Sequence, residues 1–126
     1  MKEVMRMIEI LPESQGKVAG AKFSGKITAK EYEDVVLARL DAIIKEHSKA
    51  RFLWYLDEGF LGAEAAAMWD DTKFGIKHRN DFEKLALVGG SKWMEWLTNM
   101  SAKMISGETR TFPKEQLQEA WDWLKA

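Results

Sequence analysis

Cysteine is absent from this chain of 126 residues, which excludes disulfide bonds, thiolate catalysis and zinc sites built on cysteine. Neither sign of charge dominates, because 19 Lys and Arg residues stand against 20 Asp and Glu residues. A chain so balanced has no overall field that attracts nucleic acid, and we expect no nucleic-acid partner. Long apolar runs are absent as well: no stretch approaches the roughly 20 apolar residues of a membrane span.

The length suits a single domain over residues 1–126, large enough to bury one continuous core. The apolar N-terminal stretch MKEVMRMIEIL is interrupted by Glu3, Arg6 and Glu9, and no small-residue cleavage site follows it. It therefore lacks the pattern of a signal peptide. We expect a cytoplasmic protein.

Motifs for metals, nucleotides and covalent catalysis are missing. His47 and His78 are the only histidines, and no HExxH or similar ligand spacing accompanies them. The turn Gly89-Gly90-Ser91 joins a strand to a helix N-terminus, a geometry that can bind anions, yet neither GxxxxGK[ST] nor GxGxxG is present. The sequence predicts no metal and no cofactor.

The first half of the chain reads as a hairpin followed by a helix. Residues 4–11 and 17–24 favour two antiparallel strands, since the turn residues of PESQG lie between them. Thr28-Ala-Lys-Glu31 is a capping box, in which Thr28 accepts from a free backbone N–H and Glu31 reaches back to the cap. The helix that it opens carries an apolar stripe and should end near residues 47–49.

The second half alternates between strand and helix. RFLWYLD, residues 51–57, is almost continuously apolar, as expected of a central strand covered on both faces. Further elements are expected as a helix at 63–78, a strand at 82–90, a helix from Ser91, a strand at 108–112 and a helix from Pro113. The order β-β-α-β-α-β-α-β-α predicts an α/β fold: a mixed sheet in which an N-terminal antiparallel hairpin is followed by parallel strands, with helices packed on the sheet.

Two carboxylates, Asp57 and Glu58, end the central strand. Open α/β sheets place ligand sites at this end of their strands, and paired carboxylates can perform acid–base chemistry. Asp57 could equally cap the loop or the following helix. No neighbouring His, Ser or Cys completes a catalytic set, so we expect no enzyme activity.

The helix at 63–78 and the segment before it suggest a movable element. The segment reads as a loop in which Gly59 and Gly62 flank the apolar pair Phe60-Leu61. The alanines of the helix bury little surface, and a helix held by few large side chains can detach at low cost. We assign one face of this helix to Ala65, Met68, Trp69, Thr72 and Ile76.

The chain resembles the SpoIIAA-like family, which belongs to the STAS (anti-sigma-factor antagonist) fold group and is related to the CRAL-TRIO lipid carriers. The resemblance rests on the order of elements and on WYLDEGFLG, KLALVGGSKWMEWL, TRTFP and EAWDWL. STAS antagonists carry a phosphorylatable Ser soon after the Asp that ends the strand. Here Asp57 matches that Asp, but no Ser or Thr follows before Thr72. Similarity to the lipid carriers implies an apolar ligand beside the second helix and contact with a membrane surface.

These observations predict a small binding module for an apolar or amphipathic, lipid-like molecule held between the sheet and the second helix, with residues 59–62 as a hinged lip. The predicted ligand wall is Trp54, Phe60, Leu61, Met68, Trp69 and Trp93, with Asp57 and Glu58 as polar groups at the strand end. The predicted membrane-surface residues are Lys73, Phe74, Lys77 and Arg79.

Two other functions stay open from the sequence. One is a protein-interaction regulator of the STAS kind that works without phosphorylation. The other is an enzyme that uses Asp57 and Glu58. The chain could also act as a homodimer, which the sequence does not decide.

Overall fold

The computed structural model describes residues 7–89, 98–99, 103 and 105–126. The predicted helix from Ser91, and Trp93 within it, lie outside these residues. The elements are β1 (Ile8–Ile10), β2 (Val18–Ile27), α1 (Ala29–Glu31), the π-helical segment η1 (Tyr32–Leu37), α2 (Ala38–His47), β3 (Ala50–Ala63), α3 (Ala65–Lys77), β4 (Phe82–Val88), β5 (Glu108–Phe112), the 3₁₀ turn η2 (Lys114–Gln116) and α5 (Leu117–Lys125).

The strands form one mixed sheet in the order β1-β2-β3-β4-β5. β1 runs antiparallel to β2, whereas β2, β3, β4 and β5 are mutually parallel. This arrangement confirms the predicted α/β fold with an N-terminal antiparallel hairpin. The Thr-rich strand β5 lies at an edge of the sheet.

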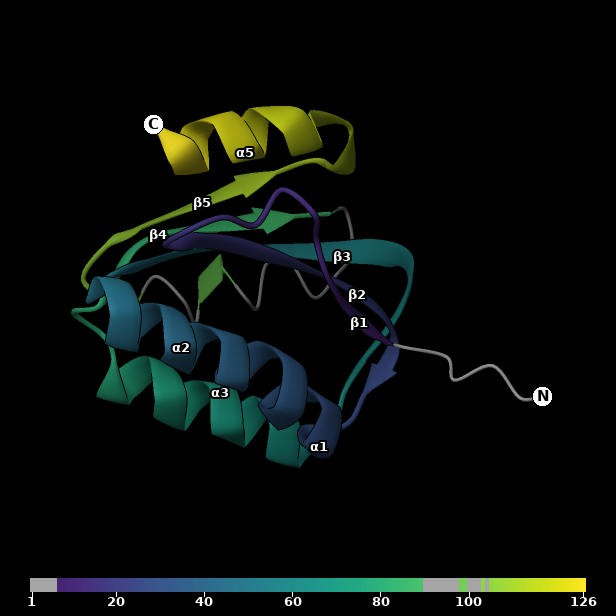
Figure 1. Ribbon diagram of the computed structural model, residues 1–126. Helices are drawn as coiled ribbons and strands as arrows, with labels where there is room; N and C mark the ends of the chain where they lie inside the picture. Colours follow the sequence, from purple (N-terminus) through teal and green to yellow (C-terminus); the bar gives the residue numbers. More distant parts are fainter. Residues whose placement is uncertain (1–6, 90–97, 100–102, 104) are drawn as a thin grey trace.

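Helices cover both faces of the sheet, with α1, α2 and α3 on one face and α5 on the other (Figure 1). β3 is the central strand, and its side chains alternate between two cores. Phe52, Trp54 and Leu56 pack under the first three helices, and Leu53 packs under α5. The near-continuous apolar run therefore reflects burial on both faces, as expected for a parallel strand. Among the helices that the structure describes, none is long and apolar enough to cross a bilayer.

The central strand is longer than predicted, because the segment expected to be a glycine loop continues β3 to Ala63. Phe60 pairs with Gly25, and Ala63 pairs with Ile27 on β2. Two register shifts near Gly25 accommodate this extension, as bulges do in a twisted sheet. The prediction of a loop here is wrong because backbone pairing with β2 outweighs the turn propensity of the glycines.

The predicted capping box forms at Thr28, but the side chain of Glu31 has other partners. The Thr28 hydroxyl accepts a hydrogen bond from the Glu31 N–H at 3.2 Å, which opens the helix. The Glu31 carboxylate, however, accepts from the backbone N–H groups of Met7 and Ile8, at 3.0 and 3.1 Å. Glu31 thus fixes the strand β1 to the helix instead of closing its own cap.

The face under α5 is held by one large aromatic ring. Ala120, Trp121 and Leu124 are buried, and Leu117 packs beside them, so these residues form the apolar stripe of the helix. The ring of Trp121 lies against Gly20 on β2, where a side chain would meet Trp121 Cη2 at 2.6 Å. The missing side chain of Gly20 provides the space for the indole.

Candidate functional site

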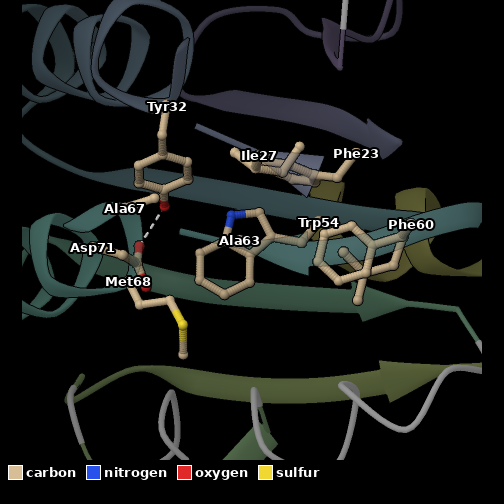
Figure 2. A pocket seen from close by; sticks show the side chains of 10 residues that line it. Phe23, Ile27, Tyr32, Trp54, Phe60, Ala63, Ala67, Met68 and Asp71 are labelled. Carbon is tan, nitrogen blue, oxygen red and sulfur yellow. Dashed lines mark hydrogen bonds between the residues drawn. The ribbon is translucent and has the colours of Figure 1, made fainter. Parts of the chain in front are cut away.

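A cavity of about 70 Å³ lies between α3 and the sheet. Its wall is formed by β2, the start of η1, β3 and α3, and Figure 2 shows the side chains that surround it. The lining residues are Phe23, Ile27, Tyr32, Trp54, Leu56, Phe60, Ala63, Ala67, Met68 and Asp71. The wall is therefore almost entirely apolar, with a polar group at Tyr32, Trp54 and Asp71.

The cavity exists because α3 meets the fold through small residues. The residues buried on α3 are Ala67 and Gly75, and the helix packs chiefly against α1 and η1. Alanine and glycine cannot fill the space between a helix axis and a sheet as Leu or Ile would. The residual gap becomes the apolar cavity.

The polar edge of the cavity is a hydrogen bond between two elements. The Tyr32 hydroxyl, at the start of η1, donates to the carboxylate of Asp71 on α3 (Figure 2). Burial raises the pKa of Asp71 to about 6, although the hydrogen bond from Tyr32 opposes this shift. Burial and the nearby carboxylate of Asp71 raise the pKa of Tyr32 well above its usual value. Tyr32 thus remains a donor, and Asp71 can change charge near neutral pH.

The Trp54 side chain adds a second polar group. Trp54 is 7% exposed and lines the cavity, and its Nε1–H has no acceptor among the described residues. Figure 2 shows the indole nitrogen on the edge of the ring that is turned toward Tyr32 and Asp71. Buried N–H groups nearly always have partners, so this donor marks a place for an acceptor.

The structure places some residues of the predicted ligand wall on the cavity and others outside it. Trp54, Phe60 and Met68 lie on the cavity wall. Leu61 and Trp69 lie outside it and are 73% and 62% exposed. Leu61 follows Phe60 in a strand, where successive side chains point to opposite faces. The structure thus places these two side chains outside the cavity, and Trp93 lies outside the described residues.

The helix face that contacts the fold also differs from the prediction. Ala67, Asp71 and Phe74 are one helical stripe and face inward, whereas Trp69 and Ile76 are exposed. An apolar periodicity favours the stripe with tryptophan and isoleucine, since the other stripe contains an aspartate. The stripe with Ala67 and Asp71 nevertheless faces inward, because its small residues let the helix approach the rest of the fold closely. Tyr32 also provides a hydrogen-bond donor for Asp71. The inward face could have been predicted from the spacing of Ala67, Asp71 and Phe74 at i, i+4 and i+7, which places them on one side of a helix.

The two carboxylates at the strand end have separate partners. Asp57 accepts hydrogen bonds from the Ser24 hydroxyl at 2.6 Å and from the Gly59 N–H at 2.8 Å. Glu58 is exposed and pairs with Lys114, and this contact lowers the pKa of Glu58. Neither residue lines the cavity. Asp57 thus stabilises the local backbone, and Glu58 connects β3 to the turn before α5.

The basic residues of α3 lie apart from the cavity. Lys73, Lys77 and Arg79 are exposed. Phe74, predicted beside them at the surface, instead packs inward, with its ring 6.3 Å from that of Phe82. In the described part of the chain, no three His, Asp or Glu side chains are grouped to hold a metal ion.

The fold and cavity define a class of protein: a small α/β domain that carries an apolar pocket beneath one helix. The chain belongs to the SpoIIAA-like family, whose family model matches residues 18–125. A similar solved structure is the crystal structure of an uncharacterized protein of the DUF3478 family with a SpoIIAA-like fold, from Shewanella loihica PV-4. It is 28% identical, covers 98% of both chains and superposes with a TM-score of 0.71. No curated protein matches the chain.

Proposed function

We propose that this domain is a binding module, not an enzyme, and that its ligand is an apolar or amphipathic small molecule. The observation that carries the proposal is the cavity beneath α3, whose wall is apolar except at Tyr32, Trp54 and Asp71. Small-molecule sites commonly combine such a wall with a few placed polar groups. Asp57 and Glu58, the candidate catalytic pair, lie outside the cavity and are engaged elsewhere.

Binding of a lipid-sized molecule requires the cavity to widen. Its free volume of about 70 Å³ is below the roughly 300–1,000 Å³ of typical ligand sites. Both ends of α3 are tied to the fold: Glu64 N–H donates to Ile27 O at 2.8 Å, and Arg79 O, just beyond the helix, accepts from Ser106 N–H at 2.9 Å. Residues 59–62 belong to the strand β3, in which Phe60 and Gly62 pair with β2, and they do not form a free lip. We propose that α3 shifts sideways over its small residues, because few large side chains hold it.

Filling the cavity should abolish binding. Ala67→Leu adds three carbon atoms to the wall at a position that is 2% exposed, and we expect affinity for the bound lipid class to fall at least about tenfold. The measurement is a screen of fatty acids, phospholipids and isoprenoids by thermal shift and native mass spectrometry. Ala66→Leu is the matched control, since Ala66 is exposed on the same helix. The proposal fails if no lipid class binds, or if both variants bind as the wild type does.

We also propose that the outer face of α3 meets an anionic membrane surface. Trp69 and Ile76 are exposed there, with Lys73 between them and Lys77 and Arg79 beyond. The Lys73 ammonium lies 5.9 Å from the Trp69 ring, and 4.0 Å from the Asp70 carboxylate. Aromatic and aliphatic side chains beside lysines are typical of helices that lie in the membrane interface.

The double variant Lys73→Glu/Lys77→Glu tests this contact. Each lysine near an anionic surface contributes about 1 kcal/mol, so the pair should lower partitioning onto vesicles at least about tenfold. Cosedimentation with vesicles of phosphatidylserine and phosphatidylcholine measures this change. Lys45→Glu/Lys49→Glu, which changes the net charge equally at the end of α2, should have a small effect. Equal losses in the two variants would show that only overall charge matters.

The exposed side chains also fit the alternative of a STAS-type interaction regulator. Leu61, Trp69 and Ile76 together are the large apolar side chains exposed in the described chain, and such residues also occur at protein interfaces. Binding to vesicles of pure lipid distinguishes membrane contact from protein recognition. A surface that recognises a protein partner would not require anionic lipid.

A further inference from the structure

We propose that the cavity takes an uncharged apolar molecule whose oxygen accepts a hydrogen bond from Trp54 Nε1–H. This inference rests on the proposed function of the cavity and specifies the chemical class of its ligand. It rules out fatty acids in their anionic form as the preferred occupant and favours alcohols and carbonyl compounds.

The unpartnered donor carries the inference. Trp54 Nε1, Trp121 Nε1 and Thr109 Oγ1 are buried without a hydrogen-bond partner among the described residues. Of these, only Trp54 belongs to the cavity wall. Trp54 is 7% exposed and its Nε1 atom is buried, so bulk solvent has little access to this N–H. An N–H held in this position is satisfied at low cost by a ligand oxygen, and left unsatisfied by a hydrocarbon.

The charge of the wall determines which oxygen is suitable. The described lining residues include no Lys, Arg or His, so nothing there compensates an anionic ligand. Asp71 lies on the same wall, and its hydrogen bond with Tyr32 holds its carboxylate at the cavity. A second carboxylate would be desolvated beside the first, which is unfavourable for both. A hydroxyl or carbonyl oxygen avoids this cost and still accepts from the indole.

The other lining residues fit a ligand that makes a single polar contact with the protein. Phe23, Ile27, Leu56 and Phe60 present only carbon to the cavity. A ligand with several polar groups would leave most of them unpaired, which costs affinity. The inferred ligand therefore has one oxygen near Trp54 and an apolar body against β2 and β3.

The test uses three six-carbon probes: 1-hexanol, 1-chlorohexane and hexanoate. Affinities are measured by NMR titration at pH 7.5 with the wild type, Trp54→Phe and Phe60→Leu. Hexanol should bind wild type at least about tenfold more tightly than hexanoate. In Trp54→Phe, the affinity ratio of hexanol to chlorohexane should fall about tenfold. Phe60→Leu alters an apolar wall without removing a donor, so it should leave this ratio unchanged. Thermal unfolding verifies that each variant is folded.

The outcomes separate this inference from the proposed function. If none of the three probes binds the wild type, the inference and the proposed function both fail. Binding of all three probes with equal affinity would preserve the binding module and overturn the inference alone. A hexanol-to-chlorohexane ratio that survives in Trp54→Phe, or falls equally in Phe60→Leu, would also overturn it, because the indole N–H would then not contact the ligand. If Trp54→Phe does not fold, Trp54 is replaced by 3-benzothienylalanine, in which a ring sulfur takes the place of the indole N–H, and the same fall in the ratio is expected.

Discussion

Replacement of Asp71 with asparagine is expected to make the protein more stable at neutral pH, by up to about 3 kcal/mol in the free energy of unfolding. Burial raises the pKa of Asp71 from 3.8 to about 6, so the folded state holds this proton more tightly than the unfolded state does. The stability associated with the proton is fully present below pH 3.8 and is lost as the pH rises through about 6. Asparagine carries no charge and can still accept from the Tyr32 hydroxyl, so it avoids this loss.

The measurement is urea unfolding of both proteins from acidic to neutral pH. The difference between them is informative, because Asp41, Glu58 and Glu83 have lowered pKa values and change stability in the opposite direction. Asp122→Asn, on the exposed side of α5, serves as the control for removal of a carboxylate. Parallel pH profiles for wild type and Asp71→Asn would contradict the prediction.

Tyr32→Phe provides a second arm of the same experiment. The Tyr32 hydroxyl stabilises ionised Asp71, and its loss should raise the pKa of Asp71 further. The pH at which stability declines should then move upward, and stability at neutral pH should fall. The same urea titration measures both effects. An unchanged midpoint would show that the two side chains are not coupled.

Substitution of Gly20 by alanine is the second large effect, and we expect it to destabilise the protein by about 1–3 kcal/mol. The new Cβ would lie 2.6 Å from Trp121 Cη2, 2.8 Å from Trp121 Cζ2 and 3.3 Å from Leu53 Cβ. Trp121 is 1% exposed, so its ring cannot turn toward solvent without opening the core. Thermal and urea unfolding measure the cost.

A double-mutant cycle locates the cause. Trp121→Phe removes the ring atoms that the new Cβ would meet, at the cost of a partly empty site. In that background, Gly20→Ala should cost less by about 0.5–3 kcal/mol, since the two residues are in contact. Additive changes would instead assign the cost to the contact with Leu53 or to the backbone at Gly20.

The cavity and the outer face of α3 give this helix two roles. Its inner stripe, with Ala67 and Asp71, forms one wall of the proposed ligand site, and its outer stripe exposes Trp69 and Ile76. A shift of α3 that widens the cavity would therefore also move the proposed membrane-contact face. Ligand exchange and surface contact are coupled through one element in this proposal.

Patterns within a single element were enough to predict much of the fold. The apolar run RFLWYLD predicted a strand buried on both faces, because a short, aromatic-rich and continuously apolar run is typical of a central parallel strand. The stripe of Ala120, Trp121 and Leu124 on α5 and the cap at Thr28 follow from helical periodicity and from local hydrogen bonding. The order of these elements then indicated the mixed sheet and the family.

Partners distant in sequence were decided only by the tertiary structure. Pairing with β2 turned the glycine segment at 59–62 into strand. Packing against α1 and η1 turned the small residues of α3 inward and left Trp69 outside. The hydrogen bond between Tyr32 and Asp71 spans 39 positions, and neither residue signals the other locally. The buried run of β3, the apolar stripe of α5 and the cap at Thr28 depend on neighbours in sequence, so the sequence alone determines them. The cavity and its polar edge depend on which surfaces meet, and this is settled only when the chain packs.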